Sequence, residues 1–168
     1  MNSKALVFLT VVMHVLSAQL VGADSWMVRP DGVGPVKIGM TLAQVNAALH
    51  QKLEKDTQDE DGCFYVSPNG HGPISFMIAG GRIVRIDVSE PGVPTSEGIQ
   101  VGDSEARARQ VYGARMKITK HAYIDTGHYL TVRSSDGRHG IRFETDNGKI
   151  TMFYAGRYDA IQYIEGCE

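Results

Sequence analysis

The order of apolar and polar residues along the chain predicts short β-strands separated by glycine-containing turns. Asn69-Gly70 and Asp136-Gly137 lie where two hairpins are expected to turn, because these residues accept the positive φ angles of tight turns. Two further strands are predicted around residues 115–123 and 158–165. The main strands are expected at residues 63–67, 73–79 and 82–88 in the first half, and at 128–134, 140–145 and 149–155 in the second.

A helix is predicted before each set of strands. Thr41-Leu-Ala-Gln44 has the pattern of a capping box, in which the Thr oxygen accepts from a backbone N–H and Gln reaches back. Ser104 is the expected cap of the second helix, which Gly113 is expected to end. The apolar residues expected on the inward faces are Leu42, Val45, Leu49 and Leu53 in the first helix, and Ala108, Val111 and Tyr112 in the second.

The two halves share a sequence pattern. VKIGMT at residues 36–41 aligns with IQVGDS at residues 99–104, and the strand regions align at an offset of 67. Residues 63–88 give six identities in 26 positions in this register. We interpret the similarity as a duplication, with chance similarity between β-rich sequences as the alternative.

The predicted fold class is therefore α+β, with two tandem units, each a helix packed on an antiparallel β-sheet. The first unit is expected at residues 24–90 and the second at residues 95–168. Pro91-Gly-Val-Pro94 is the expected linker, because proline fixes φ and removes a backbone donor.

Residues 1–23 have the pattern of a secretory signal peptide. Lys4 gives a positive start, residues 5–21 are mostly apolar, and Val21-Gly-Ala23 places small residues before the expected cleavage site. An N-terminal transmembrane helix is the alternative. No cysteine lies near the cleavage point, so lipid attachment there is not expected. We predict a periplasmic or secreted protein with no membrane anchor after signal cleavage.

The charge balance argues against nucleic-acid binding. The chain has 17 basic and 19 acidic residues and a net charge of −2. Removal of residues 1–23 takes away one lysine, which makes the mature chain slightly more acidic. Such a surface offers no basic face for a phosphate backbone.

Two cysteines are present, Cys63 and Cys167. In an oxidising compartment an isolated pair is usually a disulfide. Closing a loop of roughly 105 residues is worth about 4–5 kcal/mol by chain entropy, less any strain. A reactive thiol or a metal-binding pair is the alternative.

The sequence around the first helix resembles a known family. The pattern VKIGMTxxQV at residues 36–45 is similar to the helix-opening signature of small outer-membrane assembly lipoproteins of the SmpA/BamE type. Two such units in tandem, exported and not lipidated, resemble the β-lactamase inhibitory protein architecture. The whole mature chain, which ends Tyr163-Ile-Glu-Gly-Cys167, also resembles an uncharacterised family of small secreted bacterial proteins.

This resemblance implies helices on one face of an antiparallel sheet and a second face that is free to bind a protein. The chain departs from both families. It has no lipobox cysteine, and two cysteines cannot form the two within-unit disulfides of the inhibitor.

Two motifs indicate chemistry that the surrounding residues do not support. Gly34 to Thr41 nearly matches a phosphate-binding loop, but Met40 stands where that loop needs a lysine. Ser104, with Asp125 and His128, suggests a serine hydrolase, which requires a base within hydrogen-bond reach. We interpret Ser104 as a helix cap and keep the hydrolase as an alternative.

Metal sites and cofactors are not expected. The acidic run at residues 56–62 does not place oxygen ligands and a terminal glutamate as a calcium loop does. No histidine pair has the spacing of zinc ligands. We interpret the run as a solvated loop.

The C-terminal run carries tyrosines beside an arginine, the residue types enriched at protein-binding hot spots. Packing of an alternating strand against helices is the alternative explanation. We predict an exported, non-enzymatic protein-binding module that inhibits or neutralises an envelope or secreted enzyme, with an envelope-assembly accessory as the alternative. The candidate binding residues are Tyr154, Arg157, Tyr158 and Tyr163.

Overall fold

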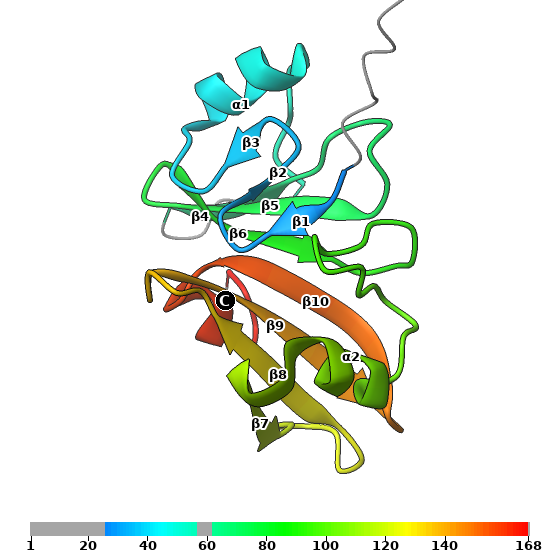
Figure 1. Cartoon of the computed structure of the whole chain (residues 1–168). Helices are drawn as coiled ribbons and strands as arrows, with labels where there is room; N and C mark the ends of the chain where they lie inside the picture. The colour runs from blue at the N-terminus through cyan, green and yellow to red at the C-terminus, as the bar shows by residue number, and fades with distance from the viewer. Residues whose placement is uncertain (1–25, 57–61, 168) are drawn as a thin grey trace, which may run out of the picture.

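The computed structural model describes residues 26–56 and 62–167, and its main feature is a seven-stranded antiparallel sheet (Figure 1). The strand order is β4-β5-β6-β10-β9-β8-β7. The first three strands are β4 (Cys63–Val66), β5 (Ile74–Ala79) and β6 (Arg82–Val88). The others are β7 (Met116–Lys120), β8 (His128–Arg133), β9 (His139–Asp146) and β10 (Lys149–Arg157).

Two short helices and a small three-stranded sheet accompany the large sheet. The small sheet consists of β1 (Val28–Arg29), β2 (Gly32–Val33) and β3 (Val36–Lys37). The helices are α1 (Leu42–Leu49) and α2 (Glu105–Tyr112), and the 3₁₀ turns are η1 (Gly113–Arg115) and η2 (Ala160–Gln162). One apolar cluster contains Val36, Val45, Phe76, Ala108 and Phe153, so both helices and the small sheet share a core with one face of the large sheet.

The prediction of two separate helix-on-sheet units is wrong. β6 and β10 pair antiparallel, with Phe153 opposite Val88 and Ala155 opposite Ile86, so the strands of both halves form one sheet. The large apolar cluster then contains residues of both halves, which do not form two separate cores. Each helix is also only eight residues long. The molecule is mostly antiparallel β-sheet.

The strand–turn–helix connections of the two halves are held by the same hydrogen bonds. Gly39 N–H donates to the Ile83 carbonyl, and Gly102 N–H donates to the Ile150 carbonyl, each at 2.8 Å. Both glycines have φ near +90°, a conformation that side chains disfavour. The GPVKIGMT stretch is therefore a turn between a short strand and a helix.

The predicted caps are present. The Thr41 hydroxyl accepts from Gln44 N–H, and the Gln44 side chain accepts from Thr41 N–H, as a capping box requires. The Ser104 hydroxyl accepts from Arg107 N–H at 3.2 Å. These bonds satisfy backbone donors that a helix start leaves without partners.

Two predicted elements and one predicted orientation are wrong. Val111, expected on the inward face of α2, is 38% exposed. The first helix ends before Leu53, because His50 takes a left-handed conformation, although Leu53 is still buried in the core. The expected strand at 158–165 is instead the turn η2 and an irregular segment, since Asp159 has helical angles. The strands expected in 63–88 and 115–155 all form.

The predicted disulfide between Cys63 and Cys167 is present, with the Cα atoms 5.4 Å apart. A disulfide is compatible with an oxidising compartment such as the periplasm or the cell exterior. The predicted signal peptide and most of the acidic run at 56–62 lie outside the described residues. In the described part of the chain, no helix is long and apolar enough to cross a membrane.

Candidate functional site

The second face of the large sheet, opposite the shared core, carries charged and aromatic side chains. Arg85 and Arg142 are both buried, and Tyr154 is 1% exposed. Cross-strand pairing brings these residues together, since Tyr154 stands opposite Asp87 on one side and Arg142 on the other. We call this surface the polar face; its members are Tyr65, Arg85, Asp87, Tyr129, Thr131, Arg142, Glu144 and Tyr154.

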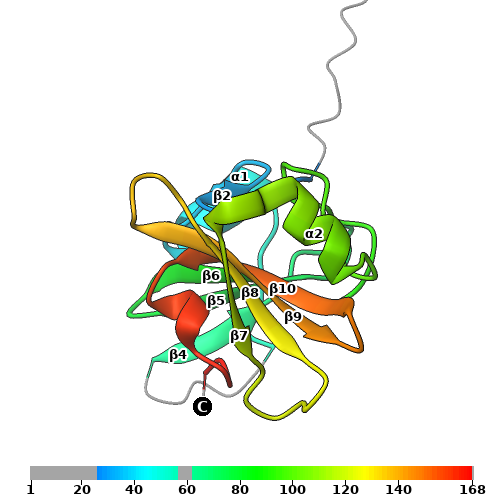
Figure 2. The same ribbon diagram turned by 60° about the horizontal axis from the view of Figure 1, so that its bottom comes forward.

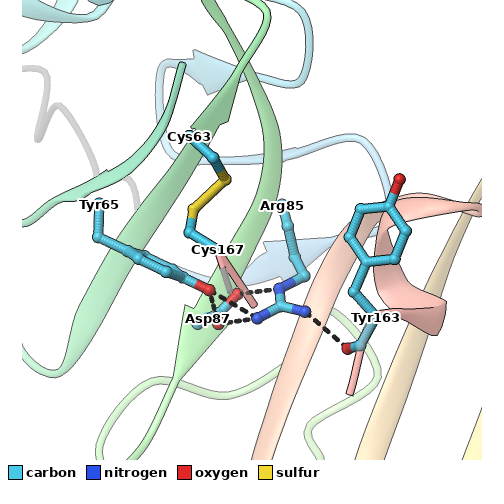
Figure 3. The surroundings of a disulfide bond; sticks show 6 residues. All are labelled: Cys63, Tyr65, Arg85, Asp87, Tyr163 and Cys167. Atoms are coloured by element: carbon cyan, nitrogen blue, oxygen red, sulfur yellow. Dashed lines mark hydrogen bonds and ion pairs between the residues drawn. A yellow bond between two sulfur atoms is a disulfide. The ribbon is translucent and has the colours of Figure 1, made fainter. Parts of the chain in front are cut away.

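One half of the polar face is organised around Arg85 (Figure 3). Its guanidinium donates to both oxygens of Asp87, at 2.7 and 2.8 Å. It also donates to the Tyr65 hydroxyl at 2.7 Å and to the Tyr163 carbonyl at 3.0 Å. Bidentate, charge-assisted bonds of this kind are the strong ones in proteins, and they offset the cost of burying the two charges.

The other half joins Arg142 and Glu144 to their neighbours. Arg142 donates to the Thr131 hydroxyl at 3.0 Å and to the Gln162 side-chain oxygen at 2.5 Å. Glu144 accepts from the Tyr154 hydroxyl at 2.8 Å. The buried charges of the polar face thus balance, two arginines against two carboxylates.

His121 connects this network to the loop before β8. Its Nδ1 atom accepts from the backbone N–H groups of Tyr123 and Ile124, at 3.1 and 3.2 Å. The proton therefore lies on Nε2, which donates to Glu144 at 3.1 Å. The ring also stacks on Tyr129 with centroids 4.4 Å apart. His121 thereby holds the backbone of Tyr123 in place.

Burial is the main cause of the raised pKa values of the tyrosines on the polar face. It raises the pKa of Tyr65 to about 12, with a further contribution from the Asp87 carboxylate. Burial and the Glu144 carboxylate raise the pKa of Tyr154 well above its usual value. Both hydroxyls therefore stay protonated at neutral pH and act as donors rather than as bases.

The C-terminal segment, residues 158–167, covers the polar face. In Figure 2 this segment, drawn in red, lies in front of the large sheet. Ala160 packs against Met77 and Val84. The disulfide fixes the end of the segment to β4 (Figure 3). Gly140 makes room for it, because a Cβ atom there would lie 2.7 Å from the Ile161 side chain. The arginines of the polar face donate to Gln162 and Tyr163 in this segment.

A pocket of about 430 Å³ opens between the C-terminal segment and the loop before β8. The hydroxyl of Tyr123 donates to the Glu165 carboxylate across this opening. Four large apolar side chains are exposed in the described residues, and three of them line this pocket. We call it the C-terminal pocket; the described residues that line it are Tyr123, Gln162, Tyr163, Ile164, Glu165 and Gly166.

The four candidate binding residues have different environments. Tyr163 is 50% exposed at the C-terminal pocket. Tyr154 is buried in the polar face and offers no surface to a partner. Arg157 is exposed and pairs with Asp159, and Tyr158 is half-buried beneath the Arg133 guanidinium, 4.2 Å from its ring centroid.

The residues of the hydrolase alternative are engaged elsewhere. Ser104 caps α2, and Asp125 pairs with Lys120 at 3.1 Å. The Nδ1 atom of His128 donates to Glu105 at 2.8 Å, because a carboxylate only accepts. The structure thus does not bring these three side chains into one hydrogen-bonded array.

No set of three or more histidine, cysteine, aspartate or glutamate residues within 26–56 and 62–167 is placed to hold a metal ion. The carboxylates of the polar face bond to arginines, tyrosines and His121 instead.

Of the six described residues that line the C-terminal pocket, the five other than Tyr163 were not candidates on sequence grounds. Ile164 and Glu165 adjoin Tyr163, so a wider window on the same run would have included them. Tyr123 lies 42 residues away from Glu165, and no local pattern places it at the C-terminus.

Comparison of the chain with protein families, with curated proteins and with solved structures finds no match.

Proposed function

We propose that the chain is an exported, non-enzymatic module that binds another protein and thereby inhibits or neutralises an envelope or secreted enzyme. The resemblance to β-lactamase inhibitory proteins is part of this proposal, as is a periplasmic or secreted location.

The observation that carries the proposal is the grouping of exposed apolar side chains at one hollow. Tyr123, Tyr163 and Ile164 converge on the C-terminal pocket from two separated segments. Isolated apolar residues on a surface are ordinary, but clusters around a concavity mark binding sites. Tyrosine also buries a large area at a low entropic cost, which is why it dominates protein-binding surfaces.

The rigidity of the surroundings supports the same conclusion. The disulfide, the bonds from Arg85 and Arg142, and the His121 contacts hold both sides of the pocket in place. A surface that is ordered before binding loses less conformational entropy when the partner docks.

The test is affinity capture with the oxidised, processed protein from envelope and secreted fractions of the producing cells. We expect one protein to be retained by the wild type and by Val111→Ala, which changes an exposed side chain on α2. The double variant Tyr123→Ser/Tyr163→Ser should lose it. Equal retention by the double variant, or no retention by the wild type, would remove the basis of the proposal.

A further inference from the structure

The C-terminal pocket combines a carboxylate with exposed aromatic rings. Among the described residues that line it, Glu165 is the only charged one. Its Oε1 atom accepts from the Tyr123 hydroxyl. A carboxylate has acceptor sites for several donors, so this bond leaves the group able to bind a further donor.

The two tyrosine rings are exposed at the same opening. Tyr123 is 68% exposed and Tyr163 is 50% exposed. The face of an aromatic ring attracts cations, and the planar guanidinium of arginine stacks on it especially well. Ile164, which is 43% exposed, adds an apolar surface of the kind on which the methylene stem of an arginine packs.

The nearby cations do not neutralise Glu165. Arg85 is paired with Asp87, and Arg142 donates to Thr131 and Gln162 beneath the C-terminal segment. In the described part of the chain, no lysine or arginine lies within ion-pair distance of Glu165. Among its described residues, the pocket therefore carries one uncompensated negative charge, on a protein whose net charge is also negative.

We propose that the C-terminal pocket receives an arginine side chain presented by the protein partner. The guanidinium bonds to the Glu165 carboxylate and stacks against a tyrosine ring, while its stem lies on Ile164. This inference rests on the proposed function and deepens it, because it states the chemistry of the partner residue that anchors the complex.

The test uses N-acetyl-arginine methylamide and its neutral isostere N-acetyl-citrulline methylamide. Each is titrated into the oxidised protein, and backbone amide NMR shifts are followed. We expect the arginine probe to shift the amides of residues 123 and 162–166. We expect citrulline to bind about 5- to 50-fold more weakly, because it lacks the charge on which both contacts depend. Equal shifts with both probes would refute the proposal.

Two variants test the role of the Glu165 carboxylate in binding the arginine probe. Glu165→Gln should weaken arginine binding about two- to fivefold. Tyr123→Phe removes the hydroxyl but keeps the ring and the carboxylate, so it should bind arginine at least as well as the wild type. The control Val111→Ala should bind as the wild type does. If Glu165→Gln leaves the affinity unchanged, the carboxylate is not the anchor and the proposal fails.

The outcome is distinguishable from failure of the proposed function. If the pocket prefers N-acetyl-phenylalanine methylamide to the arginine probe while the partner is still captured through Tyr123 and Tyr163, the protein-binding function stands and the arginine inference is wrong. If no partner is captured at all, the proposed function fails whatever the probes show.

Discussion

At the scale of single residues, the polar face depends on side chains that are buried, charged and fully partnered. Arg85 is 3% exposed and bonds to two side chains and to one backbone carbonyl. Removal of one member of such a pair leaves an uncompensated charge in a poorly solvated place. We therefore expect substitution of Arg85 to destabilise the protein, although Arg85 lies outside the apolar core.

Arg85→Met should destabilise the protein by about 3–5 kcal/mol, because Asp87 loses its counter-charge while it stays largely buried. The double variant Arg85→Met/Asp87→Leu should recover much of this loss, since it removes both charges. Urea unfolding followed by far-ultraviolet circular dichroism, with the disulfide intact, measures both. A double variant less stable than the single one would contradict the pairing.

Two substitutions of His121 test whether its Nδ1 atom holds the loop before β8. His121→Phe keeps a ring on Tyr129 but loses the acceptor for the Tyr123 and Ile124 N–H groups. His121→Asn restores an acceptor, because an Asn side chain commonly accepts from N–H groups two or three residues on. We expect amide exchange at positions 123 and 124 to be about tenfold faster in the Phe variant than in the Asn variant. Equal rates would contradict the role of Nδ1.

At the scale of elements, α2 is attached to the sheet by its first residue. Glu105 accepts from the Thr145 hydroxyl at 2.5 Å, from His128 at 2.8 Å and from Arg109 at 3.0 Å. Burial alone would raise the pKa of Glu105, but these hydrogen bonds outweigh it and lower the pKa from its usual 4.5. The helix start also favours a negative charge there.

Glu105→Gln should therefore cost about 1–3 kcal/mol at pH 7. The unfolded chain binds the proton more tightly than the folded one, so the contribution of Glu105 is complete above pH 4.5. It is lost as the pH falls through the lower folded-state pKa. The difference in unfolding free energy between wild type and variant should thus shrink in acid. Urea titrations between pH 2.5 and 7 measure it, and a constant difference would contradict the account.

Among the elements, local sequence predicts most strands but not their partners. Turn glycines such as Gly70 and Gly137 indicate where strands end, and both have positive φ in the structure. The pairing of β6 with β10 joins residues far apart in the chain, and no local pattern encodes it. That single pairing changes two expected sheets into one.

Local sequence likewise predicts only part of the candidate site. Alternation in the C-terminal run indicates which side chains share a face, but not whether another segment covers that face. Tyr154 is buried for this reason, whereas Tyr163, beyond the last strand, reaches the surface. The disulfide was predictable because two cysteines allow one pairing. The contact of Tyr123 with Glu165 was not, because only the tertiary fold brings them together.

At the scale of the whole molecule, the disulfide joins the C-terminal end of the chain to the large sheet. It fixes the C-terminal segment to β4, while the neighbouring residues bond to β6 and β9. One side of the C-terminal pocket thus consists of a segment with little secondary structure, held by one covalent bond and a few hydrogen bonds. The integrity of the pocket should depend on oxidation.

The variant Cys63→Ala/Cys167→Ala should lose about 2–5 kcal/mol of stability, because its unfolded state regains the entropy of a long open loop. Near the C-terminus, amides at 160–167 should exchange faster than in the oxidised protein, whereas those of β8 and β9 should change less. Hydrogen exchange with mass spectrometry measures this. An equal increase in amide exchange across the whole sheet would contradict a local role for the disulfide.

We propose that the C-terminal pocket is the surface on which a protein partner docks. Photo-crosslinking with p-benzoyl-phenylalanine tests it most directly, with the probe at position 163 and, as a control, at the exposed position 111 on α2. We expect a covalent adduct with one protein from position 163 and none from position 111. Adducts from position 111 alone, or equal adducts from both positions, would contradict it.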